Sequence, residues 1–364
     1  MEKSLIHNDW EYLCQFLPDN LSELAKASGS VKRWRNIKNG EELLRVILAY
    51  ALEDLSLRST AAWSTQTASE LKDTSVLPRL RKAPPLLEKV LAHLLTQRLR
   101  AESAPGPEFR INDATVLSIP GSQGTDWRLP VVCDPAQCCL RRVEITDQQG
   151  GERLDRDRPR AGEVVCGDRG LAHARGIHAV SEAGAYVLLR MHGQNIRLHN
   201  APGQPLDRDY ALKRADAGDT GTIVCVPLTG KDPVSARVLL RPLPTEAAHR
   251  NRQRLRRNAA KKGRTSQATT LRLAGYFWVL TTLPEALASD DLVLELYRIR
   301  WQIELFFKRG KGLLHFAQLR AFHPDLVRTY CLAKLIERAL IQCLHEEAIS
   351  FSPWGVPRCR RRAA

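Results

Sequence analysis

The apolar pattern of this chain changes its period near residue 109, and this change limits the folds that the chain can adopt. Upstream, residues 41–52 carry apolar side chains at helical spacing, and Ser56 is placed to cap a second helix over residues 57–63. Residues 86–100 continue the helical pattern. Downstream, short runs rich in Val, Ile and Leu alternate with turn residues, which is typical of strands. The sequence therefore predicts a helical N-terminal region followed by a region that contains both strands and helices.

The downstream region is expected to form a mixed α/β core. Three strands are expected first, at residues 109–119, 127–133 and 140–146. After a loop come a fourth strand at 164–166, a helix at 172–182 and a fifth strand at 186–191. The alternation of strands and helices is not seen in the next 80 residues or so. The later elements indicated are strands at 222–227, 236–240 and 276–282 and helices at 292–307 and 325–347.

Charge and cysteine content indicate the class of partner and the compartment. The 364 residues carry a formal charge of +15, which favours a polyanionic partner. The tight connection between the helices at 41–52 and 57–63 fits a helix-turn-helix-like unit, and it fits an ordinary helical hairpin equally well. No run is apolar enough to cross a membrane, and the first residues are not a signal peptide. Nine cysteines without a CxxC pair predict free thiols in the cytoplasm.

The segment 250–264 carries positive charges and no acid. Such a run is either a solvated linker or an arm that contacts phosphate groups. The sequence on both sides of it favours the arm. We therefore expect phosphate contacts from Arg254, Arg256, Arg257, Lys261 and Lys262.

A polar stripe runs along the helix expected at 292–307. On one continuous helix, Tyr297, Arg300, Glu304 and Lys311 fall within an arc of roughly 60°. The simplest use of such a stripe is a set of i,i+4 ion pairs on an exposed surface. The alternative is that Glu304 holds a metal ion beside a bound polyanion, and two acids elsewhere in the chain favour this alternative.

Those two acids are Asp113 and Asp168. Asp113 lies within an expected strand, where an unpaired carboxylate would be costly. Asp168 directly follows the strand at 164–166, and catalytic groups of α/β sheets gather at the carboxyl ends of strands. Together with Glu304, they supply the hard oxygen ligands that two-metal phosphoryl transfer requires.

These residues resemble the DDE transposases of bacterial insertion sequences of the IS4 type. The family signature Tyr-x2-Arg-x3-Glu-x6-Lys is filled here by Tyr297, Arg300, Glu304 and Lys311. Asn112-Asp-Ala-Thr115 resembles the first-aspartate region of the family, and Gly167-Asp-Arg-Gly170 resembles the second. The family usually has Tyr after this Asp-Arg-Gly, whereas this chain has Leu171; the aromatic residue is not a ligand, so the assignment of the aspartate stands. The resemblance covers residues 35 to 355, approximately.

The resemblance implies an α/β fold with a ribonuclease-H-like mixed-sheet core, an inserted, mostly β subdomain and a helical N-terminal domain. We expect a helical DNA-binding domain at residues 1–105. The core should come in two parts, at 106–192 and 273–320, separated by an insertion at 193–272 that carries the basic arm. A C-terminal helix with a basic tail should follow at 321–364.

The resemblance also implies roles for individual residues. Asp113, Asp168 and Glu304 would bind two Mg²⁺ ions, for which Mn²⁺ can substitute. The signature residues Tyr297, Arg300 and Lys311 would hold the phosphates near the scissile bond. Trp278 would stack on a base flipped out near the transposon end, although a place in the core of a strand explains a tryptophan there equally well.

The implied activity is Mg²⁺-dependent cleavage and strand transfer at the inverted-repeat ends of an insertion sequence. The implied partners are double-stranded DNA, at both the terminal repeats and the target, and a second copy of the chain in a paired-end complex on the nucleoid. One alternative is a truncated transposase that binds DNA ends without cutting them, because the chain ends on a basic tail soon after residue 355. Another is a metal-dependent nuclease without strand transfer.

Overall fold

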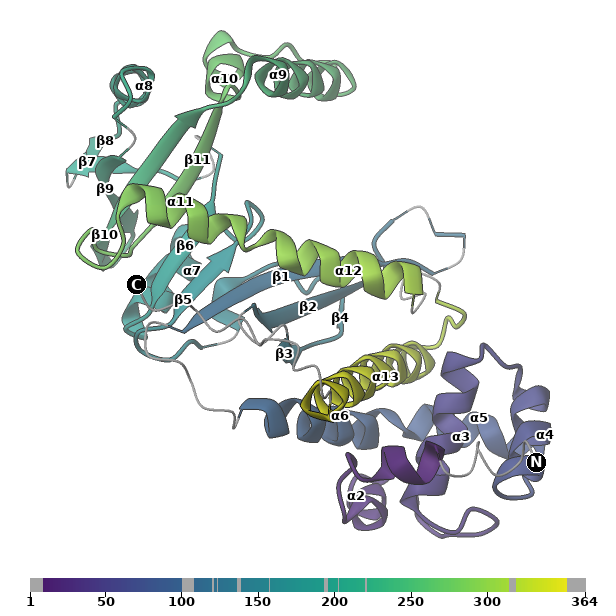
Figure 1. Ribbon diagram of the computed structural model, residues 1–364. Helices are drawn as coiled ribbons and strands as arrows, with labels where there is room; N and C mark the ends of the chain where they lie inside the picture. The colour runs from purple at the N-terminus through teal and green to yellow at the C-terminus, as the bar shows by residue number, and fades with distance from the viewer. Residues whose placement is uncertain are drawn as a thin grey trace.

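The computed structural model describes residues 9–99, 108–119, 121–122, 124–135, 139–156, 158–192, 196–201, 203–219, 221–313 and 319–351. One sheet runs through the molecule in the order β3-β2-β1-β5-β6-β11-β10-β9-β7-β8, with β4 paired to β2 (Figure 1). The strands are β1 Phe109–Leu117, β2 Trp127–Asp134, β3 Cys139–Val143, β4 Thr146–Asp147, β5 Val164–Gly167, β6 Tyr186–Arg190, β7 His199–Ala201, β8 Gln204–Pro205, β9 Gly221–Leu228, β10 Lys231–Pro242 and β11 Tyr276–Thr281.

Helices cover both faces of this sheet. They are α2 Leu21–Ala27, α3 Gly40–Leu52, α4 Leu57–Thr67, α5 Asp73–Lys82, α6 Pro84–Leu99, α7 Ala174–Glu182, α8 Arg208–Asp216, α9 Thr245–Ala260, α10 Ala268–Leu273, α11 Asp290–Arg298, α12 Trp301–Leu313 and α13 Pro324–Phe351, with a short 3₁₀ helix η1 at Leu154–Arg156. Helices α11 and α12 cross one face of the sheet, and α7 lies on the other (Figure 1).

Five strands form the ribonuclease-H-like core that the resemblance implied. Strands β1, β2 and β3 pair antiparallel, whereas β1, β5 and β6 pair parallel. All four residues of β5 are buried, as expected for a parallel strand covered on both faces. Val164 and Cys166 pack on the side of α6 and α13, and Val165 packs on the side of α7. The prediction of a mixed α/β core is confirmed, and only the third expected strand differs, because it is split into β3 and β4.

The helical N-terminal region forms as the sequence predicts. Helix α4 begins after Ser56, whose Oγ accepts a hydrogen bond from the Ser59 N–H at 3.0 Å, so Ser56 is the N-cap. The long helix α13 packs against α3, α5 and α6. The end of the chain that the structure describes therefore belongs to the same core as its beginning, while the basic tail lies outside the described residues.

The segment 193–272 differs from the expected mostly β subdomain. Its strands β9 and β10 continue the core sheet, because β10 pairs with β11 and β11 pairs with β6. The segment also holds α8, α9 and α10. The run of positive charges expected to form a linker or an arm lies on α9 and the turn that follows it. Arg, Ala, Gln and Leu are strong helix formers, so this composition favours a helix as well as high charge.

The single helix expected at 292–307 is two helices. At the junction of α11 and α12, the Arg300 N–H donates to the Tyr297 carbonyl at 3.1 Å, and the Ile303 N–H donates to the Arg300 carbonyl at 3.1 Å. Such i→i−3 bonds wind the chain more tightly than an α-helix. The polar stripe therefore crosses a junction, and the 60° arc of an uninterrupted helix does not describe it.

Six cysteines in the described part of the chain are free, and four of them are buried (Cys133, Cys166, Cys331 and Cys343). Among the described helices, none is long and apolar enough to cross a membrane.

Candidate active site

Strands β1 and β5 bring two aspartates together. Ile111 of β1 lies opposite Cys166 of β5, and the strands are parallel, so Asp113 and Asp168, each two residues further on, lie at the same level. The Asp113 side chain is only 15% exposed, and its Oδ1 accepts a hydrogen bond from the Ala114 N–H at 2.8 Å. Asp168 Oδ1 accepts one from the Gly170 N–H at 2.8 Å, which fixes the carboxylate in the turn after β5.

Helix α12 contributes Glu304, which reaches the aspartates through Arg300. The Arg300 guanidinium donates to Asp113 Oδ2 at 3.2 Å and also to Glu304 Oε1. Arg300 is 13% exposed, whereas Glu304 is 59% exposed. Within the described residues, no three His, Cys, Asp or Glu side chains stand in metal-binding geometry. The structure thus gathers the three predicted carboxylates in one region, with a guanidinium bridging two of them.

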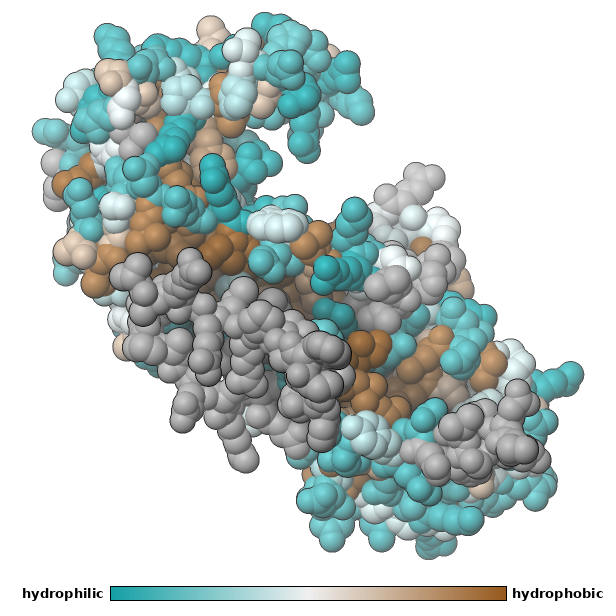
Figure 2. Space-filling view, in the orientation of Figure 1, coloured by the Kyte–Doolittle hydropathy of each residue, from teal (hydrophilic) through white to brown (hydrophobic). Residues whose placement is uncertain are grey.

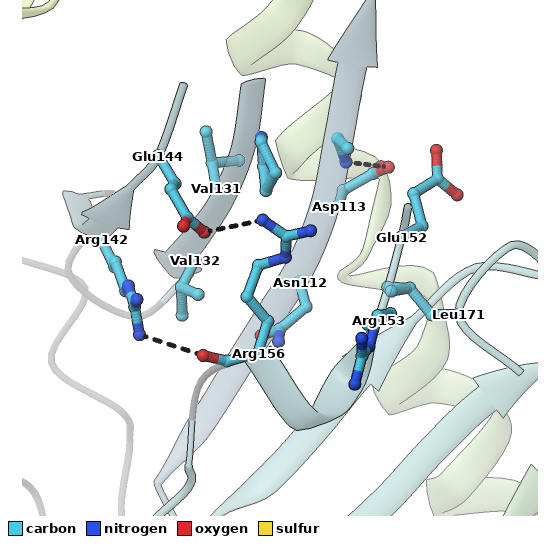
Figure 3. Close-up of a pocket in the computed structure, with 12 residues that line it drawn as sticks. Asn112, Asp113, Val131, Val132, Arg142, Glu144, Glu152, Arg153, Arg156 and Leu171 are labelled. Carbon is cyan, nitrogen blue, oxygen red and sulfur yellow. Dashed lines mark hydrogen bonds and ion pairs between the residues drawn. The ribbon is translucent and has the colours of Figure 1, made fainter. Parts of the chain in front are cut away.

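A fourth carboxylate, Glu152, lies beside Asp113. Both line a pocket between β1, β2 and the turn at Leu171, and Figure 3 shows them at one end of it, with Glu144 and Arg156 paired towards the other end. Sequence analysis missed Glu152. It lies in the loop before η1, where Gly150-Gly151 predicts only a turn, and its position depends on how this loop returns to the end of β5.

Burial and neighbouring charges raise the pKa values of Asp113 and Glu152. The pKa of Asp113 is raised to about 6, first by burial and then by the charges of Asp168 and Glu152, although the Ala114 N–H and Arg300 act in the opposite direction. Burial also raises the pKa of Glu152, and the charge of Asp168 adds to this effect. Burial is the larger cause for both carboxyl groups, and the neighbouring carboxylates add to it.

Two buried donors beside the carboxylates lack partners. The Tyr297 ring is buried against Phe277, and Arg300 lies over it at 5.8 Å. Neither the Tyr297 hydroxyl nor Arg300 Nε has a hydrogen-bond partner in the described part of the chain. Burial raises the pKa of Tyr297, so its hydroxyl keeps its proton and remains a donor. An unsatisfied buried donor costs about 1–3 kcal/mol, so both groups are ready for an acceptor that the protein does not supply.

The structure places Trp278 in the core rather than at the site. Its ring is 3% exposed, packs on the α7 side of the sheet, and donates from Nε1 to the Leu273 carbonyl at 3.3 Å. Stacking on a flipped base requires an exposed ring, which this position does not provide. Because side chains alternate along a strand, the neighbouring Phe277 faces Tyr297 instead.

The predicted phosphate contacts lie on an exposed helix and on α12. Arg254, Arg256, Arg257, Lys261, Lys262 and Lys311 are all exposed. Burial lowers the pKa of Arg169, and the positive charges of Arg190 and Arg254 lower it further, which places α9 near the turn that carries Asp168. In Figure 2 the molecule is hollowed between the lobe that holds α9 and the body that carries α12. The basic side chains of α9 therefore border an open concave side next to the carboxylates.

Comparison with known proteins identifies the family. Residues 104–337 match the model described as "Transposase DDE domain". This chain belongs to the DDE transposase family.

The relatives are transposases of bacterial insertion sequences. The chain is 34% identical over 357 residues to the putative transposase InsL of IS186A from Escherichia coli (strain K12), covering 95% of this chain and 96% of that protein. It is 34% identical over 358 residues to the transposase of IS421 from Escherichia coli, with the same coverage. The transposase of IS231B from Bacillus thuringiensis subsp. berliner is 22% identical over 90% of this chain and 77% of that protein.

A structural comparison gives a more distant likeness. The piggyBac transposase, solved by cryo-EM as a synaptic complex with hairpin DNA, matches with a TM-score of 0.48 and 10% identity over 93% of this chain and 74% of that chain. The family cleaves DNA and transfers strands, and it uses divalent cations. The resemblance expected from the signature residues is confirmed at the level of the family.

Proposed function

We propose that this chain cuts DNA at the terminal inverted repeats of its insertion sequence and joins the freed 3′ ends to target DNA, with Asp113, Asp168 and Glu304 as its cation ligands. The observation that carries this proposal is the level placement of Asp113 and Asp168 on adjacent parallel strands, with Glu304 tied to Asp113 through Arg300. This arrangement supports the proposal, because Arg300 ties Glu304 of α12 to an aspartate that lies beside the second one.

The donor chemistry of the site fits divalent cations. Mg²⁺ and Mn²⁺ prefer carboxylate oxygens, and the three proposed ligands supply only such oxygens. The raised pKa of Asp113 supports this fit, because an added positive charge would restore its ionised form. Two bound Mg²⁺ ions would activate water or a 3′-hydroxyl and stabilise the leaving oxygen.

Arg300 would exchange partners when DNA and cations bind. Its guanidinium now bridges Asp113 and Glu304. Release from one of these carboxylates would free donors for a phosphate oxygen next to the scissile bond. The unpaired Nε of Arg300 and the unpaired hydroxyl of Tyr297 would donate to the same phosphate group. These side chains would hold the substrate in line with the carboxylates without taking part in proton transfer.

The wider surface would hold the duplex and a second copy of the chain. The exposed Arg254, Arg256, Arg257, Lys261, Lys262 and Lys311 would neutralise phosphates along the concave side. The helical N-terminal region would read the inverted repeat, and two chains would pair two ends in one complex. Because different surfaces would bind DNA and cut it, a variant could lose cleavage and still bind.

The test is cleavage of a duplex that carries the element's own inverted repeat, with Mg²⁺ or Mn²⁺, by the full chain and by Glu304→Ala. We expect cleavage at the repeat boundary by the wild type and none by the variant, with equal binding by both. Strand transfer is followed in the same reaction with supercoiled target DNA. Binding without cleavage by either protein would support an inactive end-binding chain, and cleavage without joining would support a nuclease. If the wild-type chain neither binds nor cleaves the duplex, the proposal is contradicted.

A further inference from the structure

We infer that Glu152 is a fourth carboxylate of this site, which helps to hold a divalent cation beside Asp168. The inference rests on the proposed function, since it deepens the ligand set of the same site. It concerns a residue that lies outside the family signature and the Asp-Arg-Gly block. Its support comes from the packing around Gly170, from the partners of Glu152 and from the contrast with Glu144.

Gly170 provides the room that Glu152 occupies. A Cβ atom added to Gly170 would lie 1.9 Å from Glu152 Oε2 and 3.2 Å from Asp168 Oδ1. The backbone of Gly170 does not adopt the positive φ that favours glycine. The absence of a side chain at Gly170 therefore leaves room for the Glu152 carboxylate next to Asp168. A methyl group there would push the flexible end of Glu152 aside.

Two carboxylates brought so close repel each other unless a cation lies between or beside them. The charge of His173 acts on Glu152 without a contact. In the described part of the chain, the ion-pair partner of Glu152 is Arg128, whose Nη1 is 3.8 Å from Oε1, with both side chains over a quarter exposed. Such a pair is weak. In the described part of the chain, Glu152 accepts no hydrogen bond, so its oxygens are available to a ligand.

Glu144 shows how a structural glutamate looks in the same pocket. It lines the pocket with Glu152, but its Oε2 accepts a hydrogen bond from Arg156 Nη1 at 3.1 Å. In Figure 3 the paired Glu144 and the Glu152 carboxylate beside Asp113 lie apart. The two glutamates therefore form a matched pair for experiment, since both substitutions remove one acid from one pocket.

The experiment measures Mn²⁺ binding to the full chain without DNA, by isothermal titration calorimetry, with thermal unfolding followed in parallel. We expect Glu152→Gln to weaken Mn²⁺ binding about tenfold, in the range found for groups that support a metal site. Gly170→Ala should have a similar effect, because its methyl group displaces the Glu152 carboxylate without removing any charge. Glu144→Gln should bind Mn²⁺ as the wild type does.

Arg128→Gln tests whether Glu152 acts only through its ion pair. This variant should retain Mn²⁺ affinity; a loss equal to that of Glu152→Gln would assign Glu152 a structural role and overturn the inference. Wild-type affinity in both Glu152→Gln and Gly170→Ala would also overturn it. Asp168→Asn distinguishes the proposed cation site from the role of Glu152 in it. If Asp168→Asn abolishes Mn²⁺ binding while Glu152→Gln does not, only the inference about Glu152 fails. If the wild type binds no Mn²⁺, both fail.

Discussion

Strand β1 carries two charged clusters a few residues apart, and they are built differently. Near its start, Arg110 donates to Glu163 at 3.0 Å and to Asn112 at 3.3 Å, with both ionic side chains buried. Arg141 bonds the other oxygen of Glu163 at 3.0 Å, and it also bonds Asp134 and Glu108. In this first cluster, which we call the β1 network, each acid has an arginine partner.

The second cluster lies around Asp113 and has the opposite balance. Arg300 bridges Asp113 and Glu304, Arg128 makes a long contact to Glu152, and Asp168 lies in the field of Arg169 without an ion pair in the described part of the chain. Two donors there have no partner among the described residues. A buried ion pair whose hydrogen bonds are all formed holds the fold in one arrangement. Charges and donors without a protein partner remain able to bind a ligand. The balance of partners, more than burial or charge, distinguishes the structural cluster from the functional one.

The largest expected effect is the loss of chemistry without loss of fold in the second cluster. Asp168→Asn keeps an acceptor for the Gly170 N–H but removes the charge, so we expect cleavage to fall at least about a thousandfold, which corresponds to about 4 kcal/mol. The thermal midpoint should stay near the wild-type value. The measurement is the single-turnover cleavage rate of a repeat-end duplex, and a fall of less than tenfold would break the contrast.

The β1 network should respond in the opposite way. Glu163→Ala leaves the buried Arg110 guanidinium without its acidic partner and removes one acceptor of the partly buried Arg141, so we expect a loss of about 3–5 kcal/mol in the free energy of unfolding. Urea unfolding measures it. At temperatures where the variant stays folded, Mn²⁺ affinity should match the wild type. A stability loss below about 1 kcal/mol would show that this network is not structural.

Asp113 makes the stability of the metal-free protein depend on pH. Its folded pKa of about 6 lies above the ordinary value of 3.8, so the folded state holds this proton more tightly than the unfolded state does. Stability should therefore fall as pH rises from about 4 through 6, by about 3 kcal/mol for a shift of this size. Asp113→Asn should remove this component, measured by urea unfolding in chelator between pH 4 and 7.5. Saturating Mg²⁺ should restore stability at the upper pH, because it favours the ionised carboxylate; equal slopes in all three samples would contradict the assignment.

The smallest effect is expected on α9, where charge is neither buried nor paired in the manner of either cluster. Replacing Arg254, Arg256 and Arg257 by Gln should make the slope of log binding constant against log salt shallower by about 2 to 3. Fluorescence anisotropy with a repeat-end duplex measures it. A matched triple variant of arginines already paired with acids, Arg153, Arg214 and Arg272, is the control and should change the slope less.

Local signals in the sequence were enough for much of the fold. The Val-rich run of β5 and the cap at Ser56 depend on neighbouring residues, so the pattern of the chain predicts them. Asp168 was singled out because catalytic groups gather at the carboxyl ends of strands, and Asp113 because an unpaired carboxylate within a strand is costly. The family signature then supplied Glu304, which no periodicity alone could connect to the aspartates.

The remainder depends on long-range packing. No Gly or Pro marks the tight junction at Ile299 and Arg300, so an uninterrupted helix was the natural expectation. Trp278 and Phe277 are both suited to a strand, and only the covering of the sheet decides which ring is buried. Glu152 reaches Asp168 through a loop whose sequence shows a turn and nothing of its destination.

The unbroken sheet has a consequence for how the molecule would measure DNA. Strands β9 and β10 join the core through β11, so α9 is connected to β1 and β5 by a continuous ladder of backbone hydrogen bonds. A flexible linker would let DNA bound by α9 move relative to the carboxylates, whereas this rigid connection fixes the distance between α9 and the carboxylates. The sheet would then act as a ruler, and the position of the cut, counted in base pairs from the segment held by α9, would be a property of the fold.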